Sequence, residues 1–480
     1  MGPEQALIND RKKKLEELKK LGVNPYDYRF EKKDLISDLL KKSKGSVKTA
    51  GRIMSLRKMG KASFGNLQDS TGKMQFYIKE EEVKEQYEIF RNLDIGDIIG
   101  IEGELFKTST GELTIKIKNL KLLTKSLRPL PDKWHGLKDK EIRYRQRYVD
   151  LIVNPAVKEV FENRRKIIEA MREFLIKKGF VEVETPILQP IYGGTNANPF
   201  ESHLKALNMK VYMRISNELY LKRLITGGYE KVFEFSTDFR NEGIDKTHNP
   251  EFTQMETMWA YADYKDNMGL CEEMINHIVK KVFGKLKIKS GDLELNFEKW
   301  TKISFADSLK KYADVEFNKI KTIEDAKKAA KKFNVDTAKI FTIGEILADI
   351  FEAAVEPNLI QPTIVYDFPR EQYMLAKEKR DDPRFAEAFE PYIKGVELAL
   401  SYSELNDPEA LRKEWEAAEK FFKKGDTEAQ RMDKDFLRAL EYGMPPTSGI
   451  GIGIDRLTML LTGAESIRDV LFFPFMKPEE

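Results

Sequence analysis

The sequence predicts an α+β protein in which a small N-terminal β-barrel precedes a larger domain that mixes strands and helices. Between residues 48 and 123, apolar and polar residues alternate in short runs such as 74–78 and 113–117. This period of two is typical of strands with one buried face. After residue 150, strand and helix patterns mix up to the C-terminus. A chain of 480 residues is also too long for one ordinary domain, so we expect two.

Residues 1–125 are expected to form a short helix followed by the barrel. Leu15, Leu18 and Leu21 recur at helical spacing, and Gly22 ends the pattern. The strand-like runs are separated by turn residues at 70–72 and 110–111. About five short strands with polar turns suit an oligonucleotide-binding (OB) fold, although an SH3-like barrel has the same pattern.

Basic residues cluster near the N-terminus, at 11–14, 19–20 and 32–33, although the net charge of the chain is only +3. Such a cluster is typical of a nucleic-acid surface, and equally of a solvated helix face. No apolar run approaches the roughly 20 residues that span a bilayer, so we expect a soluble protein without a membrane partner. Cys271 is the only cysteine, which excludes an internal disulfide and fits a cytoplasmic location.

Residues 126–150 contain Pro129, Pro131 and a charged run, and we expect a linker there. The second domain would then occupy residues 151–480. It begins with a helix whose apolar face runs from Val157 to Leu175 and which ends at Gly179. A segment rich in lysine and alanine around 319–339 predicts a helical insertion at about 285–345.

The first chemically informative string is 239–252, which we expect to form a strand, a loop and a second strand. Arg240 would be held where its guanidinium can meet a phosphate and stabilise charge that develops on it. Glu242 can accept from an amine, and Phe252 offers a face to a purine. Taken singly, an arginine and a glutamate at this spacing are more often a surface ion pair.

The second string is 449–456, in which glycines alternate with isoleucines before Asp455 and Arg456. One face of such a strand is bare and the other is buried, and a helix is expected to begin at the arginine. Bare backbone permits close approach of a ligand, and Arg456 can stack on an aromatic base. Packing of a helix on the sheet would explain the same glycines. Glu390 and Glu397 add a pair of hard oxygen ligands that suits Mg²⁺ on ATP phosphates.

Three strings in this order resemble motifs 1, 2 and 3 of the class II aminoacyl-tRNA synthetases: 179–186, 239–252 and 449–456. Further strings at 217–224, 260–264 and 403–407 resemble the lysyl members of the class. The string 60–69 resembles their anticodon-binding OB domain. The chain is thus similar to class II lysyl-tRNA synthetases over nearly its whole length.

The resemblance implies an enzyme that activates L-lysine with ATP and transfers it to tRNA(Lys), with Mg²⁺ as cofactor. It also implies a homodimer and a catalytic domain with an antiparallel sheet flanked by helices. Arg240 and Arg456 would be the catalytic residues. ATP would be bound by Arg240, Glu242, His248, Asn249, Phe252, Glu390 and Arg456, and Mg²⁺ by Glu390 and Glu397. Lysine would be bound by Gly194, Glu218, Arg240, Glu256, Tyr402 and Glu404, and the anticodon by Phe64, Gln68 and Glu112.

Within these roles, Glu218 and Glu404 would hold the ε-ammonium of lysine, and Gly194 and Glu256 its α-amino group. Phe252 and Arg456 would enclose the adenine. For Phe64, the alternative is a residue of the barrel core.

The sequence departs from the family pattern at Met258, Leu400, Thr247 and 373–374. The family usually has tyrosine at the first position, asparagine at the second and arginine at the third. Most of these positions surround the amino acid, so they bear on its specificity. Two alternatives therefore stay open: a paralogue with an altered amino-acid pocket, and a tRNA-binding regulator without turnover.

Overall fold

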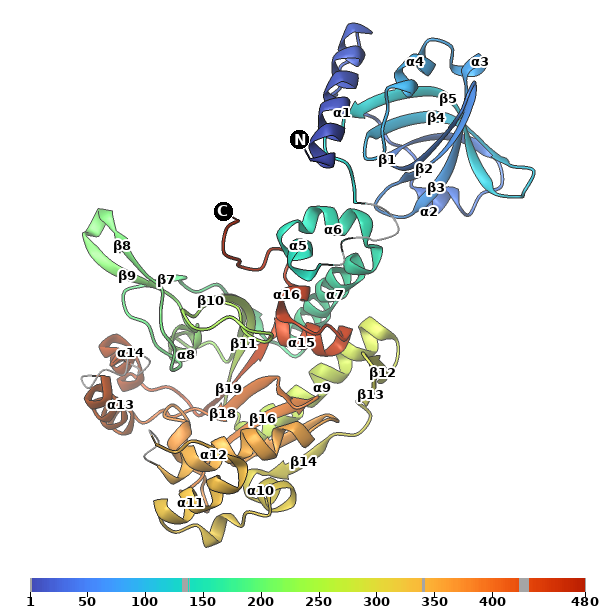
Figure 1. The fold of residues 1–480 in the computed structure, drawn as a ribbon. Coiled ribbons are helices and arrows are strands. Elements are labelled where there is room, and N and C mark those ends of the chain that lie inside the picture. The colour runs from blue at the N-terminus through green and yellow to red at the C-terminus, as the bar shows by residue number, and fades with distance from the viewer. Residues whose placement is uncertain (1, 132–136, 138, 339–341, 423–430, 480) are drawn as a thin grey trace. The chain divides into compact units, whose positions relative to one another are not determined.

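The computed structural model describes residues 2–131, 137, 139–338, 342–422 and 431–479. The chain divides into two compact units, Met1–Lys138 and Asp139–Glu480 (Figure 1). Each unit surrounds its own apolar core, because the core clusters contain residues of one unit only. Within these described residues, no helix is long and apolar enough to cross a membrane.

The first unit contains a closed barrel, which confirms the predicted N-terminal fold. Its strands are β1 (Gly45–Met59), β2 (Ala62–Gln68), β3 (Lys73–Lys79), β4 (Ile98–Lys107) and β5 (Leu113–Thr124), closed in the order β1-β2-β3-β5-β4. Burial alternates along β2 and β3, as the period of two predicts. Neighbours run antiparallel except β3 and β5, which are parallel. The short helices α3 (Glu80–Val83) and α4 (Gln86–Arg91) connect β3 to β4, and α2 (Ile36–Leu39) precedes β1.

Helix α1 (Pro3–Lys20) packs its apolar stripe inward, with Leu15 and Leu18 buried. Arg11 belongs to the basic run of the sequence, but it is buried and donates hydrogen bonds to the carbonyls of Ile95 (2.9 Å), Ser126 (3.2 Å) and Arg128 (2.9 Å). A buried guanidinium that satisfies three carbonyls stabilises the unit. Arg11 is therefore a structural residue and not part of an exposed basic surface.

The second unit is built on a mixed sheet, and within the described residues it has nine strands. Its central strands run antiparallel to their neighbours, as expected: β15 (Thr363–Tyr366), β16 (Ala388–Ile393), β18 (Ala399–Ser403), β19 (Thr447–Gly453), β11 (Glu251–Ala260) and β10 (Lys231–Phe239). The two edges differ from the expected antiparallel sheet. There β14 (Thr301–Ser304) pairs parallel with β15, and β6 (Val181–Glu182) pairs parallel with β10. The ninth strand, β17 (Val396–Glu397), pairs with β16.

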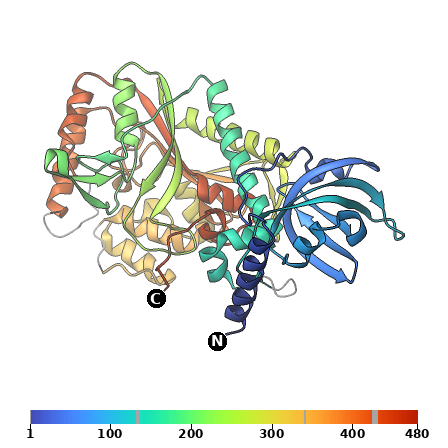
Figure 2. The same cartoon turned by 90° about the horizontal axis from the view of Figure 1, so that it is seen from above.

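Helices α7 (Pro155–Lys177), α9 (Tyr264–Phe283) and α15 (Ile454–Thr462) pack against one face of the sheet (Figures 1 and 2). The buried residues of α7 include Val157, Phe161, Met171 and Leu175, which confirms the predicted apolar face. On the strands, Phe233, Met255, Ile450 and Ile452 belong to the same core. The sheet face turned to these helices is therefore mainly apolar, and Ser448 on it accepts a hydrogen bond from Asn267 of α9 at 2.9 Å.

A second core includes Val232, Met258 and Tyr402, together with residues of six helices. These helices are α8 (Glu218–Thr226), α10 (Phe305–Ala313), α11 (Ile323–Ala330), α12 (Ile343–Ala354), α13 (Pro408–Phe422) and α14 (Lys434–Glu441). Helices α10, α11 and α12 lie beside one another in Figure 1. The segment expected as a helical insertion, 285–345, starts with the hairpin β12 (Lys287–Ser290) and β13 (Leu293–Asn296). Its residues 339–341 lie outside the described residues.

The remaining elements are short. Strands β7 (Leu188–Gln189), β9 (Met209–Met213) and β8 (Glu201–Leu204) form a small separate sheet, and α16 (Ile467–Val470) follows α15. Helices α5 (Lys140–Arg145) and α6 (Arg147–Val153) lie where the linker was expected. The carboxylate of Asp139 accepts from the N–H groups of Glu141 and Ile142, so it caps α5. Residues 132–136 and 138 of the expected linker lie outside the described residues.

Candidate active site

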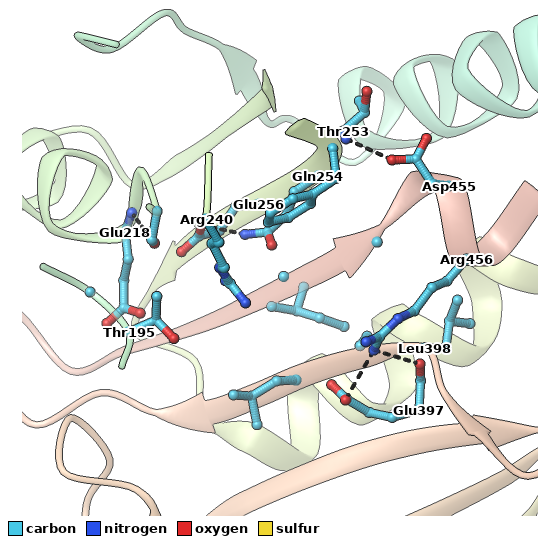
Figure 3. Close-up of a pocket in the computed structure, with 18 of the residues that line it drawn as sticks. Thr195, Glu218, Arg240, Thr253, Gln254, Glu256, Glu397, Leu398, Asp455 and Arg456 are labelled. Atoms are coloured by element: carbon cyan, nitrogen blue, oxygen red, sulfur yellow. Dashed lines mark hydrogen bonds and ion pairs between the residues drawn. The ribbon is translucent and has the colours of Figure 1, made fainter. Parts of the chain in front are cut away.

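A pocket of about 390 Å³ opens on the sheet of the second unit, a size typical of small-ligand sites. It brings together every residue that the sequence proposed for this domain: Gly194, Glu218, Arg240, Glu242, His248, Asn249, Phe252, Glu256, Glu390, Glu397, Tyr402, Glu404 and Arg456. In Figure 3, Glu218 and Thr195 lie at one end, and Arg456 and Glu397 lie at the other. Arg240, Gln254 and Glu256 lie between these ends.

The floor of the pocket is the glycine face of β19. Ile450 and Ile452 point into the core, so Gly449 and Gly451 face the pocket. A Cβ on Gly449 would lie 2.5 Å from Oε1 of Glu404 and 2.7 Å from Cε of Met258. The glycine therefore permits these two side chains to approach the backbone. The predicted bare strand face is present, and it borders a cavity.

Arg240 follows the last residue of β10, and Phe252 is the second residue of β11. The two strands pair from Lys231 with Trp259 to Phe239 with Glu251, which confirms the expected strand, loop and strand. The guanidinium carbon of Arg240 lies 5.0 Å from the centre of the Phe252 ring. This contact fixes the direction of the guanidinium, which projects into the pocket (Figure 3).

At the far end, Arg456 connects two of the predicted residues. Its Nη1 lies 3.1 Å from Oε2 of Glu397, and its Nη2 lies 3.2 Å from Nε2 of His248. The other ring nitrogen of His248 lies 2.8 Å from Asp245. Burial favours protonation of Asp245, but the N–H of Thr247 and the His248 ring outweigh it and lower the pKa of Asp245 to about 2. Asp245 is therefore a fixed anion that orients the imidazole.

Glu390 is held by two tyrosines: Tyr373, which is one of the departures from the family pattern, and Tyr392. The hydroxyl of Tyr373 donates to Oε1 at 2.5 Å, and the hydroxyl of Tyr392 donates to Oε2. Burial, and then the nearby charge of Glu397, raise the pKa of Glu390 to about 8. Both tyrosines belong to the apolar core, so the carboxylate lies at the wall of the pocket.

The opposite end, which we call the acidic end, contains Glu218, Glu256 and Glu404. Lys222 lies beside it, with Nζ 2.5 Å from Oε1 of Glu218 and 2.5 Å from Oε2 of Glu404. The hydroxyl of Tyr402 donates to the other oxygen of Glu218 at 2.7 Å. Burial, and then the charges of Glu218, Asp238 and Glu404, raise the pKa of Glu256 well above its usual value. Burial also raises the pKa of Glu404 to about 8, although the charge of Lys222 opposes this shift. The acidic end is thus a set of buried carboxylates that share one internal cation.

Comparison with known proteins agrees with this geometry. Residues 139–477 match the family described as tRNA synthetases class II (D, K and N), and residues 47–123 match the OB-fold nucleic acid binding domain. The chain belongs to the class II tRNA synthetases. The first match alone covers well over half of the chain, and it includes each pocket residue named above.

Similar proteins match this chain over nearly their whole length. A lysine–tRNA ligase of Thermoanaerobacter pseudethanolicus is 51% identical, over 98% of this chain and 96% of the relative. One of Pelotomaculum thermopropionicum is 50% identical, over 99% and 95%. A third, of Bacillus cereus, is 48% identical, over 98% and 97%.

Sequence reasoning missed several residues of this synthetase pocket. The side-chain amide of Gln254 donates a hydrogen bond to the carboxylate of Glu256 at 3.0 Å. Gln254 lies between Phe252 and Glu256 at the strand period of two, and all three line the pocket. Lys222 had a usable signal, because it follows Glu218 by one helical turn and faces a buried side. Tyr392 also had a usable signal, since it follows Glu390 by two residues on β16 and so lies on the same face of that strand. Tyr373 had none, because it meets Glu390 only through the tertiary fold.

The residues proposed for the anticodon lie on the outer face of the synthetase barrel. Phe64 and Gln68 alternate with the buried Leu67 and Ser63 along β2, so Phe64 is not a core residue. The ring of Phe64 lies 4.9 Å from that of Tyr77 on β3. The carboxylate of Glu112 accepts a hydrogen bond at 2.9 Å from the side-chain amide of Gln75, which also lies on β3. An aromatic pair and polar side chains thus share one face of β2 and β3.

Proposed function

We propose that this chain is a lysine–tRNA ligase, which joins L-lysine to the 3′ end of tRNA(Lys) through a lysyl-adenylate. The full-length likeness to proteins of that name carries the proposal. The pocket supports it, because the acidic end suits a cationic amino acid. Buried carboxylates are stabilised when a ligand cation pairs with them.

ATP would occupy the part of the pocket between Arg240 and Arg456. Arg240 would bind the α-phosphate and the carboxylate of lysine, and His248 would bind the γ-phosphate. The adenine would lie between Phe252 and Arg456, with its amine on Glu242, and Asn249 would line this site. In the present structure Arg456 pairs with Glu397, so we expect its guanidinium to turn toward the adenine when ATP binds.

Lysine would occupy the acidic end. Its α-amino group would lie against Gly194 and Glu256, and its ε-ammonium against Glu218 and Glu404, with Tyr402 beside the stem. Gly194 has a φ of +93°, and a Cβ there would lie 3.2 Å from Cβ of Glu218. A larger residue would fill the space where the α-amino group is expected.

Glu390 and Glu397 fit a magnesium ion that ATP brings. Mg²⁺ is commonly bound by one or two carboxylates together with substrate phosphates. Both glutamates line the pocket, and Glu397 pairs there with Arg456 at 3.1 Å. Within the described part of the chain, no group of three or more His, Cys, Asp or Glu could hold a metal by itself. When bound, the ion would neutralise charge on the phosphates.

The chemistry follows from these positions. A carboxylate oxygen of lysine attacks the α-phosphorus of ATP, the bond to the bridging oxygen of the β-phosphate breaks, and pyrophosphate leaves with the bonding electrons. Arg240 stabilises the negative charge that develops on the α-phosphate oxygens. A ribose hydroxyl at the end of tRNA(Lys) then attacks the acyl carbon, loses its proton and releases AMP.

The outer face of the barrel would bind the anticodon through Phe64, Gln68 and Glu112. Single-stranded bases stack on exposed aromatic rings and offer their edges to polar side chains. The proposal also includes a homodimer and a cytoplasmic location, as the resemblance implies.

The decisive experiment is ATP–pyrophosphate exchange with each of the 20 standard amino acids, followed by charging of tRNA(Lys). We expect L-lysine to stimulate exchange far above arginine and ornithine, and charging to follow. Strong exchange with another amino acid would identify the altered-pocket paralogue. No exchange with any of them would favour a regulator without turnover.

Asp455 links the two sides of the proposed adenine site. Its Oδ2 accepts the N–H of Thr253 at 2.8 Å, and Arg164 pairs with its Oδ1 at 2.5 Å. The Asp455→Asn variant loses a charged acceptor, which contributes about 1.5–3 kcal/mol. Because Phe252 and Arg456 are the neighbours of these residues, we expect the KM for ATP to rise by about 10-fold or more.

The measurement is the KM for ATP and for lysine in pyrophosphate exchange. The KM for lysine should change much less than that for ATP. Asp292→Asn, at an exposed turn of the β12–β13 hairpin, is the matched control and should leave both values unchanged. Equal increases in both values for Asp455→Asn would contradict a specific role at the adenine.

Met258 and Leu400 form the apolar part of the pocket wall. Met258 is buried against Gly449, and Leu400 faces Gly451 across the β18–β19 pair. The Met258→Tyr and Leu400→Asn variants introduce polar groups, each able to make a hydrogen bond of about 0.5–1.5 kcal/mol. We expect each to lower the KM for lysine by about 2- to 10-fold.

Pyrophosphate exchange with the single and double variants measures this effect. A KM for lysine that is unchanged or higher in the double variant would contradict the prediction. It would mean that the pocket is adapted to its apolar residues, and the exchange assay should then be extended to lysine isomers.

A further inference from the structure

Lys222 is a buried cation at the acidic end of the pocket. Its side chain is 1% exposed, and so is that of Glu404, which it contacts. Helix α8 supplies both Lys222 and Glu218 one turn apart, while Glu404 follows β18. The sheet and the helix therefore meet through one ammonium group shared by two carboxylates. Neither the reaction nor the roles proposed above use this lysine.

The other oxygens of the two carboxylates are also held. Oε2 of Glu218 accepts the hydroxyl of Tyr402, and Glu404 accepts the backbone N–H of Gly449. The ammonium of Lys222 lies 5.6 Å from the centre of the Tyr402 ring. Contacts from several elements thus fix the position of Nζ. A side chain held in this way keeps its partners at a fixed separation.

The charges of this region come close to balance with lysine bound. Glu218, Glu256 and Glu404 supply three negative charges when ionised, and Lys222 supplies one positive charge. The α-amino and ε-amino groups of lysine supply the remaining two. The carboxylate of lysine would pair with Arg240. Without Lys222, one buried negative charge would be left over, and burial makes such a charge costly.

We infer that Lys222 is a positioning residue that holds Glu218 and Glu404 at the separation that accepts a single side-chain ammonium, and that its charge lowers the number of protons that lysine must displace from them. This inference rests on the proposed function, because it concerns the amino-acid site of that reaction. It adds a residue that acts on the substrate through the two glutamates. The simpler alternative is an ion pair that only stabilises α8 against the sheet.

Removal of the Lys222 charge distinguishes a positioning role from a purely structural ion pair, because only the first predicts a change in the number of protons bound by the glutamates. Two facing carboxylates without a cation between them raise the pKa of one another, so one of them takes up a proton. Lysine must then displace this proton when its ammonium binds. Because a lower pH favours the protonated pocket, lysine binding in such a variant weakens as pH falls. A purely structural defect has no such dependence.

The other titratable groups around this site are Glu256, Tyr402 and Asp238. Asp238 and Glu256 lie on β10 and β11, and both carboxyls stay in the parent and in the variants. Burial raises the pKa of Asp238 to about 6, and burial followed by the charge of Glu218 raises the pKa of Glu256 well above its usual value. Tyr402 remains neutral because burial, and then the charge of Glu218, raise its pKa well above its usual value. The ratio of the variant KM to the parent KM at each pH removes the contribution of these groups.

The experiment uses full-length Lys222→Met and Lys222→Gln, with L-lysine as the probe. We expect the ratio of the KM for lysine to that of the parent to rise as pH falls from about 8.5 to 6.5, by up to about 10-fold per unit for one proton. The KM for ATP should stay within about 2-fold of the parent. Lys222→Arg keeps the charge, so its ratio should not depend on pH.

Calorimetry provides a second measurement that needs no turnover. Titration of lysine at pH 7 in buffers of different ionisation enthalpy counts the protons released on binding. We expect about one more proton from Lys222→Met than from the parent. Lys14→Met is the matched control, because Lys14 also pairs one turn along a helix, with Asp10 at 2.9 Å, but in the barrel unit.

A ratio that does not depend on pH in Lys222→Met and Lys222→Gln, with no additional proton released, would overturn the inference and leave a structural ion pair. The inference would also be overturned if Lys222→Arg showed the same pH dependence as the two neutral variants. Failure of the proposed function is distinguishable, because the parent protein itself would then give neither exchange nor heat with lysine.

Discussion

Replacement of Arg240 by alanine is expected to lower the rate of lysine-dependent pyrophosphate exchange by about 10²–10³-fold, the loss typical when one group that stabilises transition-state charge is removed. Arg240 projects into the pocket from the end of β10, and the Phe252 ring fixes its direction. No other arginine among the described pocket residues lies at this position, since Arg456 stands at the far end. Steady-state exchange at saturating lysine and ATP measures the effect.

Two further variants show whether the loss is specific. Arg240→Lys keeps a charge but cannot make two parallel contacts, so we expect a smaller decrease than for alanine. Arg165→Ala, on the exposed side of α7, removes an arginine with ordinary surface ion pairs and should have no effect. Exchange by folded Arg240→Ala within about 3-fold of the parent would refute the assignment of this arginine to the α-phosphate.

Replacement of Phe64 by alanine is expected to raise the KM for tRNA(Lys) in charging by about 5- to 150-fold, because a base stacked on an aromatic ring contributes about 1–3 kcal/mol. The Phe64 ring lies on the outer face of β2, beside Tyr77, and is half-buried. The pyrophosphate exchange rate should stay at the parent value. The reaction pocket lies in the other unit, and it includes no residue of the barrel.

Tyr28→Ala is the matched control for this variant. Tyr28 belongs to the same unit and is 97% exposed, but it is not on β2 or β3. Its loss should leave charging unchanged. If Phe64→Ala and Tyr28→Ala charge tRNA(Lys) equally well, the anticodon is read elsewhere. If Phe64→Ala also loses exchange, the variant has disturbed the protein as a whole.

Much of the fold could be predicted because its signals are local. The period of two marked the barrel strands, and the period of a helix marked α7. The alternation of glycine and isoleucine at 449–453 predicted a strand with one bare face, and β19 has that face toward the pocket. The parallel edge strands β6 and β14 could not be predicted in this way, because pairing between distant segments leaves no periodic signal.

The same distinction between local signals and long-range contacts applies to the candidate site. The sequence indicated which residues carry charge or aromatic rings at motif positions, such as Arg240 and Arg456, and the structure brings them to one cavity. It did not indicate their partners. Arg11 belonged to a basic run in the sequence and proved to be buried against three carbonyls. Charge patterns in a sequence do not reveal which members of a run face inward.

By itself, the sequence predicted a small barrel followed by an α+β domain, the resemblance to the family and most of the candidate site residues, because these depend on residue type and on spacing along the chain. Only the tertiary structure decided that Lys222 lies between Glu218 and Glu404, and that Tyr373 donates to Glu390. Glu404 is far from Lys222 along the chain, and the two meet only where α8 packs against the sheet. The net charge and the bound protons of the pocket follow from that contact, since burial makes each unpaired charge costly.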